Sequence, residues 1–280
     1  MTLIHLNNSL PNRLSKLKQW FWHRKGLVYH RLCNGTVQAQ LRDYKSIPII
    51  IISFNQLYYL QQQIDFLLRH GYKRIVVLDN HSTYQPLLAY FETLDPRVTL
   101  IRLSENLGHL AFWKSEAVFQ TYSKGYYVVS DADIVPVDDC PHDVLLQLRV
   151  LLDKAYDRTK VGLSLALDDI PETNPNKAAI LNWESQFWTS KLKANVYKAE
   201  IDTTFALYRP GYRYHKKRFT KAWRTDFPLQ ARHGGWYIDP KQLSEEQEYY
   251  MKTANASASW QINAQGELVN SIHKTLYRDE

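Results

Sequence analysis

Short, almost uninterrupted runs of apolar residues alternate with helical patterns from residue 48 onward, and this alternation constrains the fold of the 280-residue chain most strongly. The predicted strands of the first half are residues 48–52, 74–78, 98–101 and 126–130. The segments between them have helical patterns, at residues 56–70, 84–94 and 108–120. Strands that are apolar along their whole length and separated by helices indicate a parallel sheet covered on both faces. The sequence therefore predicts an α/β, Rossmann-like fold with a mostly parallel sheet.

The second half continues this alternation up to the C-terminal region. Its predicted elements are a helix at 142–156, a strand at 161–165, a helix at 175–189, a strand at 203–208 and a helix at 245–254. Ser244 followed by Gln247 is typical of a capping box that opens the last helix. Because no repeat or low-complexity linker divides the chain, we expect one domain with two halves and an N-terminal appendage. The predicted bounds are 1–45 for the appendage, then 46–140 and 141–280.

The appendage has the pattern of a basic amphipathic helix. Leu14, Leu17, Trp20 and Phe21 recur at helical spacing, and Lys and Arg residues lie between them. Such a helix either packs on the main domain or lies on an anionic membrane face. The second interpretation predicts peripheral membrane contact through residues 10–30.

The formal net charge of +7 predicts attraction to an anionic partner, such as nucleic acid, a lipid surface or a phosphorylated substrate. Cys33 and Cys140 are far apart and form no C-x-x-C pattern, so neither a disulfide framework nor a structural zinc site is expected. The longest apolar runs are too short to span a bilayer. These features predict a cytoplasmic protein, either free or peripheral on the inner membrane face.

Polar residues follow three of the predicted strands at the point where each ends. Ser53-Phe54-Asn55 follows the first strand, Asp79-Asn80-His81-Ser82 the second, and Asp131-Ala132-Asp133 the fourth. Because parallel strands have their carboxyl ends at one edge of the sheet, these side chains are expected to converge on one ligand. Two carboxylates spaced two residues apart suit a hard divalent cation that carries a diphosphate.

The ordered set of these motifs, together with Asn106-Leu107-Gly108, resembles glycosyltransferases of the GT-A fold, especially the family 2-like enzymes. The resemblance covers about residues 46–140. It implies a nucleoside-diphosphate-sugar donor, with a UDP-sugar favoured, bound by the first half, while the second half binds the acceptor. The residues implied in donor binding are Ser53, Asn55, Asp79, Asn106, His109, Lys114 and Asp131.

The same resemblance implies a site for Mn²⁺ or Mg²⁺. Asp133 would bind the cation directly, and Asp131 would contact the donor ribose or the water shell of the cation. Many GT-A enzymes add a histidine from the C-terminal part, and His233 is the candidate here, with His215 and His273 as rivals. Further side chains that could bind the diphosphate are Arg232, Lys216 and Lys217.

The catalytic base is not marked by a clear motif, because the acidic pair expected late in a family 2 domain is missing. Asp202 could face the cleft from a strand end, and Glu184 lies in an aromatic helical segment that could stack on a sugar. Asp168 and Asp169 follow another strand and are further candidates. Inversion and retention of the anomeric configuration both stay open.

Several functions are disfavoured by missing motifs. The chain has no G-x-G-x-x-G after its first strand, no G-x-x-x-x-G-K-[ST], no H-E-x-x-H and no G-x-S-x-G. The sequence therefore predicts a metal-dependent glycosyltransferase that modifies a glycan or a lipid-linked acceptor in cell-surface polysaccharide synthesis. The alternatives are a sugar nucleotidyltransferase and a non-catalytic binder of nucleic acid or glycan. Nucleic acid is not expected as a partner of the transferase.

Overall fold

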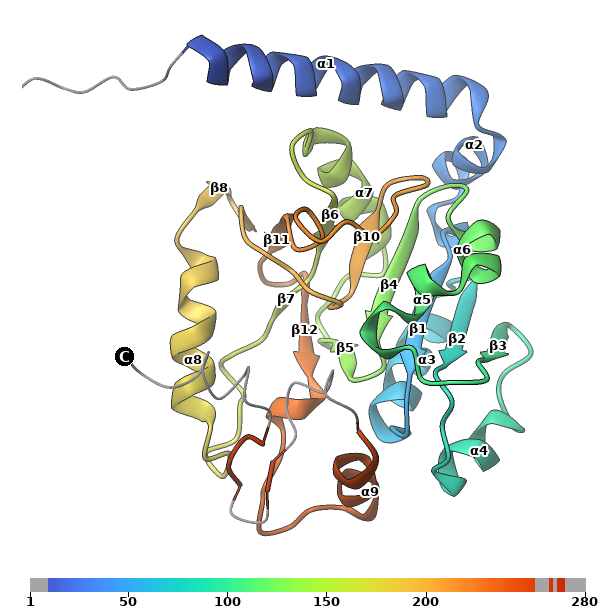
Figure 1. Ribbon diagram of the computed structural model, residues 1–280, viewed down its shortest axis with the longest axis vertical. Helices are drawn as coiled ribbons and strands as arrows, with labels where there is room; N and C mark the ends of the chain where they lie inside the picture. The colour runs from blue at the N-terminus through green and yellow to red at the C-terminus, as the bar shows by residue number, and fades with distance from the viewer. Residues whose placement is uncertain (1–9, 255–261, 264–265, 270–280) are drawn as a thin grey trace, which may run out of the picture.

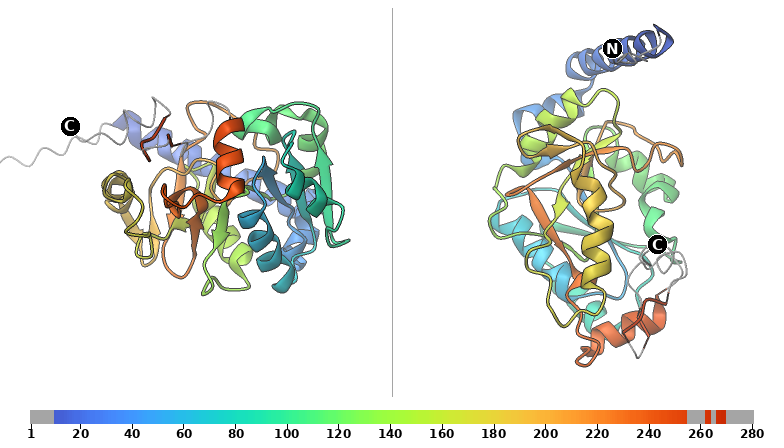
Figure 2. Two further views of the ribbon diagram at one scale, coloured as in Figure 1. Left: turned by 90° about the horizontal axis from the view of Figure 1, so that it is seen from below. Right: turned by 90° about the vertical axis from the view of Figure 1, so that its left-hand side faces the viewer.

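The computed structural model describes residues 10–254, 262–263 and 266–269. These residues form a central mixed sheet with helices on both faces and a smaller sheet beside it (Figure 1). The long helix α1 lies at one end of the molecule, and the short helix α9 lies at the opposite end (Figures 1 and 2). The predicted α/β, Rossmann-like class is confirmed.

Within the described residues, nine strands form the central sheet in the spatial order β3-β2-β1-β4-β10-β6-β11-β9-β8, and β5-β12-β7 form the smaller sheet. The strands are β1 Ile49–Ser53, β2 Ile75–Asp79, β3 Val98–Arg102, β4 Tyr127–Asp131, β5 Ile134–Pro136, β6 Lys160–Gly162, β7 Ser164–Leu165, β8 Lys191–Lys193, β9 Val196–Tyr197, β10 Ala206–Tyr208, β11 Ala222–Thr225 and β12 Gln230–His233.

The helices follow the predicted alternation through most of the chain. The α-helices are α1 Leu10–Cys33, α2 Gly35–Arg42, α3 Tyr58–Arg69, α4 Gln85–Phe91, α5 Ala111–Lys114, α6 Glu116–Tyr122, α7 Val144–Lys154, α8 Lys177–Ser185 and α9 Glu245–Thr253. The 3₁₀ helices are η1 Tyr44–Ser46, η2 Gly108–Leu110, η3 Gln186–Trp188 and η4 Gly234–Trp236.

Alternate residues of the central strands pack against different helices. Ile49 and Ile51 of β1 belong to the core cluster that includes α3, α4 and α7. Ile50 and Ile52 belong to the second cluster, with α5 and α6. Because successive strand residues point to opposite faces, a strand buried on both faces must be apolar throughout. This requirement explains the unbroken isoleucine run at the start of the first half.

The sheet has a topological switch point between β1 and β4. β1 pairs in parallel with β2 on one side and with β4 on the other. Ser53 lies opposite Asp79, and Ile52 lies opposite Asp131 in the register. The helix that follows β1, α3, packs on one face of the sheet, whereas α5 and α6, which lead into β4, pack on the other face. Ligands bind beside such a switch point in open α/β sheets.

β10 runs against its neighbours and makes the sheet mixed. It pairs antiparallel with β4 and with β6. A side chain at Gly162 of β6 would place its Cβ 2.7 Å from both the Ala206 Cβ and the Phe205 carbonyl oxygen, so glycine permits this close pairing. The loop after β10 consequently leaves toward the edge where the parallel strands begin.

Three predicted elements differ from those observed. The predicted helix at 108–120 is broken into η2, α5 and α6, because the backbone at Ser115 leaves the helical region at φ −86° and ψ 87°. The predicted strand at 161–165 is divided between β6 in the central sheet and β7 in the smaller sheet. The strand predicted at 203–208 begins only at Ala206.

The N-terminal region consists of two helices with different surroundings. Val37 of α2 is fully buried in the main core, and Gln40 donates from Nε2 to the Tyr126 carbonyl oxygen at 2.8 Å. The side chains of α1 from residue 14 to residue 22 are exposed, and the helix contacts the body further along, through His23, Leu27 and Arg31 (Figure 1). The part of the N-terminal region that extends from the domain is therefore α1, and α2 belongs to the body.

Candidate functional site

The carboxyl ends of β1, β2 and β4 bring the predicted polar residues to one edge of the central sheet. Ser53 and Asp79 are fully buried there, and Asp131 is partly exposed. The Ser53 hydroxyl is buried and has no hydrogen-bond partner among the described residues. An unpartnered buried hydroxyl costs folding free energy. A polar group of a bound ligand would supply the missing hydrogen bond.

Asp133 and His233 lie side by side, although they are distant in sequence. The Asp133 Oδ2 atom is 3.6 Å from the His233 Nδ1 atom. The pairing of β12 with β5 sets this proximity, because it places His233 opposite Ile134. The backbone N–H of Gly234 donates to the Asp133 carbonyl oxygen at 2.7 Å and ties the two loops together.

The turn at His233 depends on a glycine. A Cβ at Gly234 would lie 2.4 Å from the ring of Tyr59 on α3, so no larger residue fits without displacement of that ring. The His233 ring stacks on Trp236 with ring centroids 5.4 Å apart and planes inclined by 15°. Its Nδ1 atom accepts a hydrogen bond from the Gly235 N–H at 3.1 Å. These contacts fix the imidazole beside Asp133.

Asp131 is oriented by the segment that precedes β10. The Thr203 hydroxyl donates to the Asp131 Oδ2 atom, and the Asp131 N–H donates to the Thr203 carbonyl oxygen at 3.1 Å. Burial raises the pKa of the Asp131 carboxyl well above its usual range, and the charges of Asp133 and Asp202 raise it further. A bound cation would oppose both effects by favouring the carboxylate.

The predicted three-residue metal set is only partly assembled. Among the described residues, no group of three or more His, Cys, Asp or Glu side chains is arranged to hold a metal ion. Asp133 and His233 supply two ligand types, while Asp131 is held by Thr203. Mg²⁺ commonly uses one or two carboxylates and takes its other ligands from substrate phosphates and water. The residues present therefore fit a cation that arrives with a diphosphate.

Asn55 shapes the edge through contacts within the chain. Its Oδ1 atom accepts from the N–H groups of Thr83 at 2.7 Å and Tyr84 at 3.0 Å, and its Nδ2 atom donates to the Thr253 hydroxyl at 2.9 Å. Its φ of 50° lies in the left-handed region, which asparagine tolerates better than most residues. This geometry favours a role in holding the loop after β2 over direct contact with a donor.

Asp79 is also tied to its surroundings. Its Oδ1 atom accepts from the Ser82 N–H, and its Oδ2 atom accepts from the Arg102 Nε atom, each at 3.0 Å. Because its side chain is fully buried and both oxygens accept hydrogen bonds within the chain, Asp79 supports the loops after β2 and β3 and presents no exposed oxygen to a nucleobase. Contact with the base stays a prediction.

The loop after β3 contains the remaining predicted donor-binding residues. The Asn106 Oδ1 atom accepts from Asn80 Nδ2 at 2.8 Å and from the Gly108 N–H at 2.9 Å. Lys114 donates to the Leu107 carbonyl oxygen at 2.7 Å. The side chains of Lys114 and His109 are exposed. Asn106 thus builds the loop, and the two basic side chains border it.

The helix α9 covers this edge of the sheet, which the sequence did not indicate. Its predicted capping box, Ser244 with Gln247, is confirmed. The Glu246 carboxylate accepts from the Tyr58 N–H at the start of α3 at 3.1 and 3.2 Å, and the Tyr249 hydroxyl donates to Thr83 Oγ1 at 3.0 Å. Figure 2 shows α9 in front of the strand ends when the molecule is seen from below.

Tyr250 of α9 reaches toward the carboxylates. Burial raises the pKa of its phenol well above the usual range, and the negative charges of Asp133 and Asp131 add to this effect. The same combination, burial with the nearby Asp133, raises the pKa of Tyr59. The charge of Asp133 therefore acts on both phenols, and both stay protonated at neutral pH.

The two predicted catalytic bases have opposite environments. Glu184 is 3% exposed and forms a buried ion pair with Arg224, which lies over the Phe187 ring at 4.2 Å. A carboxylate sequestered in this way cannot reach an acceptor, so the geometry contradicts Glu184 as base. Asp202 is exposed and close enough to Asp131 for its charge to raise the pKa of that carboxyl.

The other basic and acidic candidates are engaged or lie elsewhere. Arg232 pairs with Asp169, which also accepts from the Tyr237 hydroxyl. The exposed residues at 215–217 follow β10, and its reversed direction places them toward the edge where the parallel strands begin. His215, Lys216 and Lys217 are therefore on the wrong side for a site at the strand carboxyl ends. His273 lies outside the described residues.

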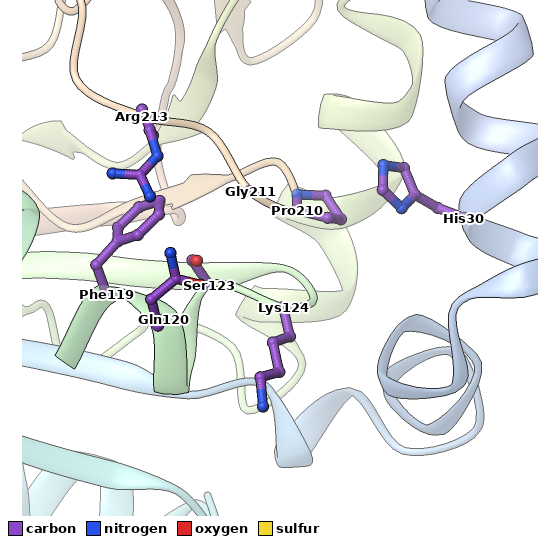
Figure 3. Close-up of a pocket in the computed structure, with 8 residues that line it drawn as sticks. All are labelled: His30, Phe119, Gln120, Ser123, Lys124, Pro210, Gly211 and Arg213. Carbon is purple, nitrogen blue, oxygen red and sulfur yellow. The ribbon is translucent and has the colours of Figure 1, made fainter. Parts of the chain in front are cut away.

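A cavity of about 300 Å³ lies at that other edge, between α1, α6 and the loop after β10 (Figure 3). Its lining includes His30, Phe119, Lys124 and Arg213. Arg213 is engaged in a two-point ion pair with Glu116 at 2.8 and 2.9 Å. The cavity lies at the opposite edge of the sheet from the Asp131 and Asp133 carboxylates. It is therefore not the predicted donor site.

The first half of the chain is a doubly wound α/β fold, and two carboxylates lie at its topological switch point. Proteins of this class bind their ligands at the carboxyl ends of the parallel strands. Within that class, residues 49–161 match the glycosyl transferase family 2 model. The match confirms the predicted resemblance and the predicted enzyme class, a glycosyltransferase. It spans β1 to β6 and includes the Asp131-Ala132-Asp133 motif, whereas His233 and α9 lie beyond it.

Solved structures with similar folds are distant in sequence. The mannosyltransferase PcManGT from Pyrobaculum calidifontis, in complex with GDP-Man and Mn²⁺, is 14% identical with a TM-score of 0.44, covering 94% of this chain and 75% of that chain. Glucosyl-3-phosphoglycerate synthase from Mycobacterium tuberculosis is 12% identical with a TM-score of 0.38, covering 62% of this chain and 59% of that chain. No curated protein matches the chain.

Proposed function

We propose that this glycosyltransferase is metal-dependent and moves a sugar from a nucleoside-diphosphate-sugar, with a UDP-sugar as the first candidate, to a glycan or lipid-linked acceptor in cell-surface polysaccharide synthesis. The observation that carries the proposal is the proximity of Asp133 and His233 at the switch point, with Oδ2 and Nδ1 3.6 Å apart. Asp133 follows β4 in the first half of the chain, and His233 ends β12 in the second half.

Asp133 and His233 would hold the cation, Mn²⁺ or Mg²⁺, together with oxygens of the diphosphate and water. For Nδ1 of His233 to bind a metal, it would release the hydrogen bond from the Gly235 N–H. A cation at this position supplies a Lewis acid that neutralises the charge on the departing nucleoside diphosphate. Asp131, held by Thr203, would fix the donor ribose or the water bound to the cation.

Asp202 is the best remaining candidate for the base that takes the acceptor proton. Its carboxylate is exposed, and its backbone is anchored because the Asp202 carbonyl oxygen accepts from Lys160 Nζ at 2.6 Å. An anchored, exposed carboxylate near the donor site can meet a hydroxyl that approaches from solvent. The buried Glu184 lacks this access.

A peripheral contact with the inner membrane face through residues 10–30 belongs to the same proposal. No helix in the described part of the chain is both long and apolar enough to cross a membrane. The support for peripheral contact comes from α1, which carries exposed aromatic and basic side chains.

Calorimetric titration with UDP, GDP, CMP and TDP, with and without Mn²⁺, tests the donor and the metal. We expect one diphosphate to bind only with Mn²⁺, and Asp133→Asn to weaken that binding at least tenfold, about 1.4 kcal/mol. Asp139→Asn is the matched control, since Asp139 is exposed and lies in the loop after β5, outside the turn that carries Asp133.

Two results would contradict the metal site. Equally tight binding without Mn²⁺ would show that donor binding needs no metal, and an equal loss of affinity in both variants would show that Asp133 has no specific role in it. If no nucleotide binds to the folded protein, the non-catalytic binder becomes the better explanation.

A further inference from the structure

One face of α1 attaches this helix to the body. Leu27 is 9% exposed, and the His23 Nε2 atom lies 2.7 Å from the Asp153 carbonyl oxygen. The Arg31 Nη2 atom forms an ion pair with the Asp153 carboxylate at 2.9 Å. His23, Leu27 and Arg31 recur at intervals of four, so they lie along one side of the helix. This side faces α7.

The opposite side of α1 is exposed and carries most of the large apolar side chains of the helix, with lysines among them. Helical geometry at about 100° per residue places the remaining large apolar side chains mainly around the far side of the helix from Leu27. Their exposed fractions are Leu14 65%, Leu17 62%, Phe21 58%, Trp22 55%, Val28 53%, Tyr29 60% and Leu32 71%. We call these seven residues the outer face of α1. By the same geometry Lys18 and Lys25 lie about 180° and 160° around the helix from Leu27, so this exposed side combines large apolar side chains with two lysines. An exposed helix face of this composition marks an interaction site.

The charge on α1 identifies the partner of the outer face. The helix sequence contains no Asp or Glu, while Lys16, Lys18, Arg24 and Lys25 are all exposed. Lys25 lies over the Trp22 ring at 5.1 Å, and Arg24 lies 5.9 Å from the centroid of the Trp20 ring. A second copy of this helix would bring like charges together. Aromatic, aliphatic and basic side chains in one helix instead suit the interface of an anionic bilayer.

The position of α1 sets the orientation of the site. α1 lies at the end of the molecule where the parallel strands begin, and α9 covers the end where they finish (Figures 1 and 2). The contacts of His23 and Arg31 with Asp153 fix α1 to the body that carries the strands. If the outer face rests on a bilayer, the strand carboxyl ends point away from it.

We propose that the outer face of α1 docks on an anionic lipid surface and holds the transferase edge toward the water. The acceptor hydroxyl is then met away from the lipid headgroups, on a glycan end that extends into solvent. The acceptor part of this inference rests on the proposed transferase function. The docking part depends only on α1.

Vesicle sedimentation of the full chain tests the docking. We expect binding to vesicles of phosphatidylcholine with phosphatidylglycerol, little binding to phosphatidylcholine alone, and at least a tenfold loss in a Leu17→Glu/Phe21→Glu variant. Leu181→Glu/Leu192→Glu is the matched control, because these side chains are 37% and 45% exposed but lie outside α1. Equal losses in the two variants would overturn the proposal.

The role of charge is tested with lysine pairs. Lys18→Gln/Lys25→Gln should weaken binding to the anionic vesicles several-fold, whereas Lys241→Gln/Lys252→Gln, which are also exposed but lie at the α9 end, should leave it nearly unchanged. Light scattering without lipid measures the oligomeric state and so tests the rival explanation, in which the outer face binds a second copy of the chain. A dimer that becomes monomeric in the Leu17→Glu/Phe21→Glu variant, with no lipid binding by the native chain, would assign the outer face to a second copy.

The thiols of the chain allow a test of orientation. Cys33 at the end of α1 is exposed and Cys140 is buried, so an environment-sensitive fluorophore can be attached at Cys33. Its emission should shift to shorter wavelength when anionic vesicles are added. The same label on Lys241→Cys in a Cys33→Ser chain, in the exposed loop before α9, should not shift. A shift at both positions would overturn the orientation. Nucleotide titration, which needs no lipid, separates this failure from failure of the transferase proposal.

Discussion

At the scale of single residues, Lys160 is the most unusual side chain near the site. It is fully buried, and its Nζ atom donates to the Asp202 carbonyl oxygen at 2.6 Å and to the Tyr208 hydroxyl at 2.9 Å. Burial lowers the pKa of Lys160 to about 7, although the charges of Asp202, Asp131 and Glu200 oppose the shift. Lys160 thereby anchors the backbone segment that orients Asp131.

This lowered pKa makes stability depend on pH in a defined direction. A lysine in the unfolded chain stays protonated up to about pH 10.4, so between about pH 7 and that value the unfolded state binds more protons. The free energy of unfolding should therefore rise with pH in this window because of Lys160, by at most about 1.4 kcal/mol per pH unit. A Lys160→Met variant should lose this rise.

Urea unfolding at pH 6.5, 8 and 9.5 measures the difference in stability between native chain and variant. Other titrating groups largely cancel in that difference. Lys154→Met is the control, because Lys154 is exposed and its variant should follow the native chain at every pH. A Lys160→Met curve parallel to the native curve would show that the burial of Lys160 does not shift its titration in this range.

Residue positions were predictable only where they follow from the local sequence, and the roles of the site residues stay predictions. Asp131 and Asp133 could be placed because a strand end fixes both the edge and the direction of the chain. Glu184 was misassigned because its partner, Arg224, comes from β11, far along the sequence. The burial of Lys160 was equally hidden, since no sequence pattern marks a lysine that enters the core.

At the scale of elements, α9 is held over the site by polar contacts and by partly buried side chains. Tyr249 and Met251 pack against the core cluster and Tyr250 is largely removed from water, but none of the side chains of α9 is fully buried, whereas α3 buries five. Its hydrogen bonds to the site join the Glu246 carboxylate to the Tyr58 N–H, the Thr253 hydroxyl to Asn55 Nδ2 and the Tyr249 hydroxyl to Thr83 Oγ1. A helix with so little apolar burial opens at low free-energy cost.

Hydrogen exchange should therefore distinguish the two helices. We expect amides of α9 to exchange at least tenfold faster than those of α3 in the free protein. Glu246→Ala should increase the rate in α9 further, because it removes the acceptor for the Tyr58 N–H, while central amides of α3 keep their rates. Equal protection of α9 and α3 would instead make α9 a fixed wall of the site.

Strands were predicted correctly where the residue pattern alone defines them. The prediction failed where pairing with strands distant in sequence sets the length or direction of a strand. β1, β2 and β4 are parallel, buried strands, so their apolar runs identify them, and β3 is a partly buried parallel strand at the sheet edge whose apolar run is shorter. The predicted strand at 161–165 was divided because Gly162 admits β10 on one side while the chain moves to pair with β12. The residues of β10 do not reveal that it runs antiparallel to its neighbours. For this reason the sequence placed His215 and its neighbours at the wrong edge of the sheet.

At the scale of the whole molecule, the two ends have separate tasks. α1 contributes one core side chain, Leu27, and reaches the body through polar contacts to Asp153, while the carboxylates lie at the far end. Sites this far apart with no shared partners usually act independently. Lipid docking and nucleotide binding should then have a coupling free energy close to zero.

This independence is measurable by nucleotide titration with Mn²⁺ in the presence and absence of anionic vesicles. We expect the Kd to change by less than twofold, about 0.4 kcal/mol, and to be the same in the Leu17→Glu/Phe21→Glu variant. Asp133→Asn should lose nucleotide binding but keep vesicle binding, because Asp133 is remote from α1. A tenfold gain in nucleotide affinity on vesicles would show instead that docking of α1 is transmitted through the sheet to the strand carboxyl ends, since linkage would require the nucleotide to strengthen docking equally.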